Sequence, residues 1–226
     1  MRRPFATRRE AGEKLAAKLT AYANRPDVLV LALPRGGVPV GYEVARALHA
    51  PLDVFIVRKL GVPGHEELAM GAIASGGVRV VNQELTRAMA IPASVIDAIG
   101  HREEQELQRR ERLYRGDRPP PNVGGRTVIL VDDGLATGST MRAAALALRK
   151  MHPAKLIVAV PVGAPETCDE FRQAVDEVIC AVTPHWFTAV GSSYADFAQT
   201  SDAEVRELLQ RAAAHYDDSL GRSVTA

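Results

Sequence analysis

Residues 128–140 read VILVDDGLATGST, a stretch that changes character twice within a few residues. Its apolar start indicates a buried strand, and Asp132 and Asp133 stand where that strand should end. Small and hydroxyl-bearing residues follow and lead into 139–151, an Ala/Leu-rich stretch typical of a helix. A strand, a Gly-containing loop and a helix N-terminus in this order predict an anion site, because loop amides and the positive end of the helix would face the bound anion.

The same alternation of strand and helix recurs along the chain, with short breakers between the elements. Uninterrupted apolar strands indicate burial on both faces, which is typical of parallel sheets covered by helices. We therefore predict an α/β fold with an open, mostly parallel sheet flanked by helices. The expected strands are 28–33, 52–57, 127–132, 155–162 and 176–182, and the expected helices are 8–23, 38–50 and 139–151.

A less regular region separates the two strand–helix–strand units. Around Gly76 and Gly77, the stretch 69–82 predicts a hairpin or paired short strands. Residues 97–115 alternate acidic and basic side chains with a thin apolar stripe, which favours a solvated or partner-facing helix over a nucleic-acid-binding one. We expect a single domain over 1–226, in which 83–122 is a helical insertion and linker beside a small hood region.

Composition excludes several classes of protein. The chain has 226 residues, of which 46% are hydrophobic and 24% charged, and its formal net charge is +1. No global basic field favours nucleic acid or an anionic membrane surface, and no apolar run is long enough to span a bilayer, so we expect neither partner and a cytoplasmic location. Cys168 and Cys180 are too few for a disulfide framework, so both are expected to be reduced core residues.

The adjacent carboxylates limit which ligand the predicted anion site could take. Two carboxylates would repel a polyphosphate, yet they suit vicinal ribose hydroxyls, which donate hydrogen bonds to carboxylate oxygens. A ribose 5-phosphate unit satisfies both the aspartates and the phosphate loop.

This arrangement resembles the type I phosphoribosyltransferases, whose signature is an apolar strand, two acidic residues and a TGxT-type phosphate loop. The resemblance implies that Asp132 and Asp133 hold the ribose of phosphoribosyl pyrophosphate (PRPP) and that Mg²⁺, bound mainly through ligand oxygens and water, is the cofactor. It assigns the 5′-phosphate to Ala136, Thr137, Gly138, Ser139 and Thr140.

Two further segments suit the pyrophosphate of such a ligand. LPRGG (33–37) lies at the first strand–helix turn, and the resemblance places a pyrophosphate loop there, formed by Arg35, Gly36 and Gly37, with a non-proline cis peptide expected at Arg35–Gly36. Arg58 and Lys59 should end the strand 52–57 and begin a mobile loop, 60–70, that closes over the site. The catalytic set implied is Arg35, Arg58, Lys59, Asp132 and Asp133.

The acceptor is less well specified. Trp186 or Phe187 could stack on a planar heterocycle, and a core position for one of them is equally compatible with the sequence. Ala136 stands where the hypoxanthine–guanine enzymes carry an aspartate, which disfavours a 6-oxopurine. The wider pattern resembles an uncharacterised bacterial branch of the family, and we expect a homodimer.

Other interpretations were weighed against this one. HEELA (65–69) lacks the second histidine of a zinc protease, and GGVPVGY (36–42) lacks the Lys-Ser/Thr of a nucleotide-binding P-loop. A non-catalytic PRPP- or nucleotide-binding regulator remains the alternative, because no general base can be identified. The retained Arg58–Lys59 pair favours turnover, since a sensor need not stabilise a leaving group.

Overall fold

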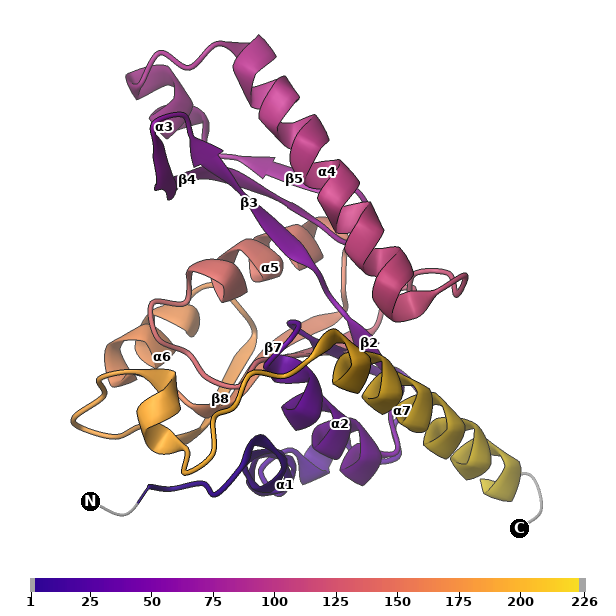
Figure 1. Cartoon of the computed structure of the whole chain (residues 1–226). Coiled ribbons are helices and arrows are strands. Elements are labelled where there is room, and N and C mark those ends of the chain that lie inside the picture. The colour runs from indigo at the N-terminus through magenta and orange to yellow at the C-terminus, as the bar shows by residue number, and fades with distance from the viewer. Residues whose placement is uncertain (1–2, 224–226) are drawn as a thin grey trace.

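A computed structural model describes the backbone of residues 3–223 and the side chains of residues 3–218. Two sheets organise it (Figure 1). The strands are β1 (Val28–Ala32), β2 (Leu52–Val54), β3 (Val57–Val62), β4 (His65–Ala74), β5 (Val78–Val81), β6 (Thr127–Val131), β7 (Lys155–Val162) and β8 (Glu177–Val182). The α-helices are α1 (Arg8–Ala16), α2 (Gly37–Leu48), α3 (Gln83–Ala88), α4 (Ala93–Arg115), α5 (Ser139–Lys150), α6 (Pro165–Phe171) and α7 (Asp202–Ser223), with 3₁₀ turns η1 (Thr20–Tyr22) and η2 (Val190–Ser193).

The main sheet has the strand order β2-β1-β6-β7-β8, and every neighbouring pair is parallel. Every residue of β1 and of β6 is buried, as their uninterrupted apolar sequences predicted. The prediction of an open, mostly parallel sheet flanked by helices is confirmed.

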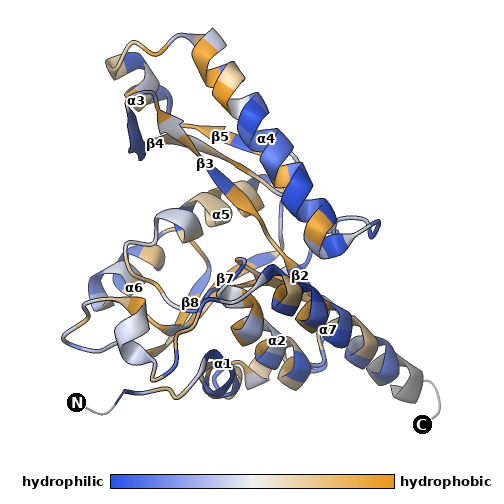
Figure 2. Cartoon of the chain, in the orientation of Figure 1, coloured by the Kyte–Doolittle hydropathy of each residue, from blue (hydrophilic) through white to orange (hydrophobic). Residues whose placement is uncertain are grey.

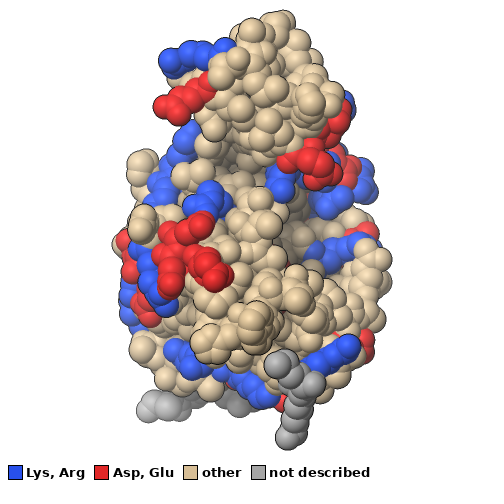
Figure 3. Space-filling view, turned by 90° about the vertical axis from the view of Figure 1, so that its left-hand side faces the viewer, with Lys and Arg blue, Asp and Glu red and all other residues tan. Residues whose placement is uncertain are grey.

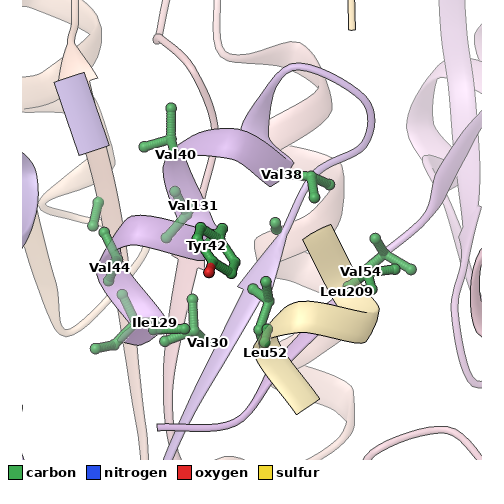
Figure 4. Close-up of a cluster of buried hydrophobic side chains, with 14 of the residues drawn as sticks. Val30, Val38, Val40, Tyr42, Val44, Leu52, Val54, Ile129, Val131 and Leu209 are labelled. Atoms are coloured by element: carbon green, nitrogen blue, oxygen red, sulfur yellow. The ribbon is translucent and has the colours of Figure 1, made fainter. Parts of the chain in front are cut away.

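Alternating side chains of each strand enter two separate cores. Val28 and Val30 point toward α1, α2 and α7, whereas Leu29 and Leu31 point toward α5 and α6. Figure 4 shows the first core, where side chains of α2 and α7 pack against those of β1, β2 and β6. Because both faces are covered, the polar edge at the carboxyl ends of the strands is left to bind a ligand.

The second sheet is antiparallel, with the order β3-β4-β5, and together with α3 and α4 it forms the hood. Leu107 of α4 is buried with Leu60 and Met70 of this sheet, and α5 lies between the hood and the main sheet (Figure 1). The expected hairpin over 69–82 is confirmed as β4–β5, whose turn contains Gly76 and Gly77 at positive φ. In Figure 2, α4 is mostly hydrophilic with a few apolar residues, in line with its thin apolar stripe.

Two expectations about these segments are corrected. The strand expected at 52–57 is two strands, because the chain leaves the main sheet after Val54 and Val57 begins the second sheet. The expected irregular loop 60–70 is mostly a β-hairpin, in which Gly61 sits at a bulge and only Pro63 and Gly64 form the turn.

Cys168 and Cys180 are joined by a disulfide, where the sequence predicted two reduced thiols. Cys168 of α6 is buried and Cys180 of β8 is partly buried against the same core, with their Cα atoms 6.9 Å apart. Gly163 makes room for them, since a Cβ at this position would lie 2.4 Å from Cys168 Sγ. Sequence separation alone could not reveal this spatial neighbourhood.

Within residues 3–223, no helix is both long and apolar enough to cross a membrane.

Candidate active site

The acidic pair and the loop that follows it lie at the carboxyl edge of the main sheet. Asp132 and Asp133 follow β6 directly, and α5 begins at Ser139 after a loop that ends at Gly138. The side chains of Thr137, Ser139 and Thr140 are exposed there. The N-terminus of α5 and these hydroxyls therefore present donors at one place, which is the arrangement that binds phosphate in many proteins.

Close packing fixes the shape of this phosphate loop. Gly138 has φ +70°, and a Cβ there would lie 2.5 Å from the ring of Phe171 on α6. The hydroxyl of Thr167 donates a hydrogen bond of 2.7 Å to the carbonyl oxygen of Ala136. Helix α6 thus supports the loop from behind while its hydroxyl side stays accessible.

The PRGG turn (residues 34–37) packs directly against the two aspartates. A Cβ on Gly36 would lie 2.1 Å from Asp133 Oδ2, and one on Gly37 would lie 3.1 Å from Asp132 Oδ1. Only glycine allows this approach, so the predicted pyrophosphate and ribose segments are neighbours. The non-proline cis peptide is Pro34–Arg35, one bond before the expected Arg35–Gly36.

Burial and mutual repulsion dominate the electrostatics of the pair. Burial, followed by the charge of Asp133, raises the pKa of Asp132 well above its usual range, although the Asp133 N–H donates to Asp132 Oδ1 over 2.8 Å. Burial also raises the pKa of Asp133, and a hydrogen bond from Arg8 opposes that rise. The site therefore favours ligands that bring positive charge or hydrogen-bond donors.

Arg8 is a residue of this site that the sequence analysis missed. Its Nε donates to Asp133 Oδ2 over 2.8 Å, and its side chain is only 12% exposed. The hydroxyl of Tyr194 donates to the Asp133 carbonyl oxygen over 2.5 Å. Both residues are far from Asp133 along the chain, so no local spacing could have connected them.

The side chain of Arg35 lies near the start of the C-terminal helix and the end of α4. Its Nη1 lies 3.9 Å from Asp202 Oδ1 at the start of α7, and Tyr114 of α4 donates to the same oxygen over 2.6 Å. The basic side chain expected at the pyrophosphate loop is thus present, and its ion pair with Asp202 is long.

Arg58 and Lys59 lie within β3 of the second sheet. The sequence analysis had placed them at the end of a main-sheet strand, so this expectation is corrected. Arg58 pairs with Glu103 of α4, with Nη2 and Nε at 2.7 and 2.9 Å from Oε2. Both basic residues line a cavity of about 680 Å³ together with Thr140 of the phosphate stretch. Figure 3 shows the face of the molecule hollowed between its upper and lower parts.

The two aromatic candidates for stacking differ in their surroundings. Trp186 is 82% exposed, and Phe187 is partly buried against the small cluster that contains Phe5 and Tyr194. Of the two alternatives left open by the sequence, the core position suits Phe187, and Trp186 is the side chain with an accessible face.

Comparison with known proteins identifies the family. The family profile described as the phosphoribosyl transferase domain matches residues 64–197, which include the acidic pair and the phosphate loop. The chain belongs to the phosphoribosyl transferase family.

Individual relatives of the chain extend the match. A Mycobacterium tuberculosis protein whose name describes a phosphoribosyl transferase is 46% identical over 208 residues, covering 92% of this chain and 47% of that relative, so the chain spans about half of its length. A uracil phosphoribosyltransferase of Lactobacillus gasseri is 33% identical over 150 residues, covering 63% of this chain and 68% of that relative. The crystal structure of TT1426 from Thermus thermophilus has a TM-score of 0.82 and 40% identity, covering 93% of this chain and 99% of that one.

The residues of the site bear on how it could hold Mg²⁺, the cofactor that the family resemblance implies. The described part of the chain holds no group of three or more His, Cys, Asp or Glu side chains placed to bind a metal ion. Mg²⁺ commonly keeps several waters and binds through substrate phosphates. The raised pKa values of the acidic pair also fit a site that receives a cation together with its ligand.

Proposed function

We propose that the chain is an Mg²⁺-dependent phosphoribosyltransferase that moves ribose 5-phosphate from PRPP to a nitrogenous acceptor. The observation that carries this proposal is the contiguity of Asp132, Asp133 and the phosphate loop at the carboxyl edge of β6, with the PRGG turn packed against them. In the reaction, the bond from ribose C1′ to the pyrophosphate oxygen breaks and pyrophosphate leaves with the electron pair. An acceptor nitrogen then bonds to C1′ and loses its proton.

Each part of the site has a role in this proposal. Asp132 and Asp133 accept hydrogen bonds from the ribose hydroxyls and favour positive charge on the ribosyl group as the bond breaks. The backbone and hydroxyls of the phosphate loop bind the 5′-phosphate. The residues of that loop are Ala136, Thr137, Gly138, Ser139 and Thr140.

The leaving pyrophosphate is bound by the PRGG turn and by basic residues of the hood. Gly36 and Gly37 keep the turn free of side chains beside the acidic pair, and the Gly37 N–H itself donates to the Leu33 carbonyl oxygen. The guanidinium of Arg35 turns toward the pyrophosphate from Asp202. Lys59 is better placed than Arg58 to follow a moving ligand, because Arg58 is paired with Glu103. When bound, Mg²⁺ neutralises charge on the pyrophosphate oxygens.

The acceptor is a planar nitrogen heterocycle in this proposal. Trp186 offers an exposed aromatic face. It precedes Val190, whose side chain packs so closely on Gly134, next to the acidic pair, that a Cβ on Gly134 would clash with it. Uracil is the first compound to test, because a relative carries that substrate in its name.

Binding and turnover test the proposal separately. Titration calorimetry with PRPP and Mg²⁺ should give a dissociation constant in the millimolar range or tighter, and pyrophosphate should be released in the presence of one heterocycle of a screened set. Replacing both Asp132 and Asp133 with Asn should weaken PRPP binding, with about 1.5–3 kcal/mol at stake for each charge-assisted hydrogen bond. No heat from a folded protein would contradict the proposal, and binding without pyrophosphate release would favour a regulator.

A further inference from the structure

Arg8 is held at the acidic pair by contacts from three directions. Its Nε donates to Asp133 Oδ2 over 2.8 Å, its Nη1 donates to the Ala198 carbonyl oxygen over 2.6 Å, and its guanidinium lies 3.9 Å from the centre of the Phe197 ring. A surface arginine that merely solvates a helix makes few such contacts. The first residue of α1 is therefore fixed in place by the segment that precedes α7.

These contacts also determine the position of the Asp133 carboxylate. Oδ2 receives the Arg8 N–H, and it also lies so close to Gly36 that a Cβ there would be 2.1 Å from it. The charged and titratable groups that face Asp133 are Arg8 from α1, the adjacent Asp132, and Tyr194, whose hydroxyl binds the Asp133 carbonyl. Arg8 is the cation among them, so it offsets the repulsion between the two carboxylates.

We infer that Arg8 is a positioning residue, which orients the Asp133 carboxylate and keeps it negatively charged so that it can accept hydrogen bonds from the ribose hydroxyls. This inference rests on the proposed function. Arg8 lies outside residues 64–197, the part that matches the family profile, so the role belongs to an N-terminal element of this chain.

A purely structural role would have different consequences. If Arg8 only fastened α1 to the sheet, its loss would lower stability and weaken every ligand alike. If Arg8 acts through Asp133, its loss should weaken ligands that carry ribose hydroxyls and should have no further effect once Asp133 is replaced.

The experiment is a double-mutant cycle of Arg8→Gln and Asp133→Asn, with titration calorimetry of ribose 5-phosphate and of inorganic pyrophosphate in the presence of Mg²⁺. Arg8→Gln should weaken ribose 5-phosphate binding by about tenfold or more, the size of one charge-assisted hydrogen bond, and should change pyrophosphate binding less than about twofold. The double variant should bind no more weakly than Asp133→Asn. Arg8→Lys should recover part of the loss, because it restores the charge without the forked donor.

Arg9→Gln is the matched control, since the neighbouring Arg9 is 73% exposed and contacts neither aspartate. Its Nε lies 3.3 Å from Glu13 and 3.5 Å from Glu43, and Glu43 keeps its hydrogen bonds from Arg46 in the variant. Additive losses in the cycle, or equal losses for ribose 5-phosphate and pyrophosphate, would overturn the role of Arg8. If Arg8→Gln does not fold, the cycle of Arg8→Lys with Asp133→Asn decides between the same outcomes. A wild-type protein that binds neither ligand would instead overturn the proposed function and the role of Arg8 with it.

Discussion

At the scale of single residues, the site combines a closely packed glycine turn with two adjacent carboxylates that repel each other. Gly36 and Gly37 lie so close to Asp132 and Asp133 that no side chain fits between the turn and the carboxylates. Burial raises the pKa of both aspartates, and the charge of Asp133 raises that of Asp132 further, so the hydrogen bonds within the protein do not fully compensate the pair. Such pairs often mark functional sites, because a bound ligand supplies the missing donors or charge.

This electrostatic strain predicts a stabilising substitution. Asp132 has a pKa above its unfolded value, so its contribution favours folding at pH values below the unfolded pKa and is lost as the pH rises through the folded pKa. Asp132→Asn should therefore raise the Tm at pH 7, and the gain should shrink as the pH approaches about 4. Calorimetric unfolding across this range measures it, with about 2–4 °C expected for each 1 kcal/mol.

Asp169→Asn provides the comparison for that substitution, because Asp169 is 68% exposed and pairs with Arg172 on the surface. It should change the Tm little at any pH. A lower Tm for Asp132→Asn at pH 7 would show that the carboxylate is favourably solvated in the folded protein.

At the scale of elements, the sequence predicted what local periodicity determines and missed what depends on tertiary contact. The main-sheet strands and the helices α2 and α5 follow from uninterrupted apolar runs and amphipathic spacing. Glycine and proline in 60–70 suggested an irregular loop, yet burial of Leu60 and Met70 against α4 supports a hairpin there. The disulfide and the bond from Arg8 to Asp133 join residues whose proximity only the fold creates.

The hairpin has a buried base and an exposed tip, which predicts two kinds of hydrogen exchange. Leu60 and Met70 are buried, whereas residues 63–68 are exposed. Amides of the base should be protected with and without PRPP and Mg²⁺, while amides of 61–68 should gain protection only when the ligand is bound, because the tip then covers the site.

Exchange at β5 serves as the internal reference for the hairpin experiment, since Val78–Val81 pairs with β4 away from the tip and should not respond to ligand. Equal exchange at 61–68 with and without saturating ligand would mean that the hairpin is a static support. Lys59 would then have no part in closing the site.

At the scale of the whole molecule, α4 connects the hood to both sides of the site. Glu103 near its middle binds Arg58 of β3, and at its end the buried Arg115 donates to the Asp53 carboxylate and the Val54 carbonyl oxygen of β2. Tyr114 binds Asp202 of α7, which also faces Arg35 of the PRGG turn. One helix therefore links the hairpin, the edge of the main sheet and the C-terminal helix (Figure 1).

The hydrogen bond from Tyr114 to Asp202 tests how much this link contributes to stability. Burial, and then this hydrogen bond, raise the pKa of Tyr114 to about 12. Because the neutral phenol is favoured in the folded state, its contribution is present below the unfolded pKa near 10 and is lost as the pH rises from about 10 to about 12. Tyr114→Phe should lower the free energy of unfolding by about 1–2 kcal/mol at pH 7, as expected for a hydrogen bond to a charged group at a partly open position.

Denaturant unfolding at pH 7 and pH 11 should show that the difference in the free energy of unfolding between wild type and variant narrows at the higher pH. Tyr42→Phe in the α2 core controls for the loss of a hydroxyl elsewhere. A difference that stays constant between the two pH values would mean that packing of the Tyr114 ring, and not its bond to Asp202, holds α4 against α7.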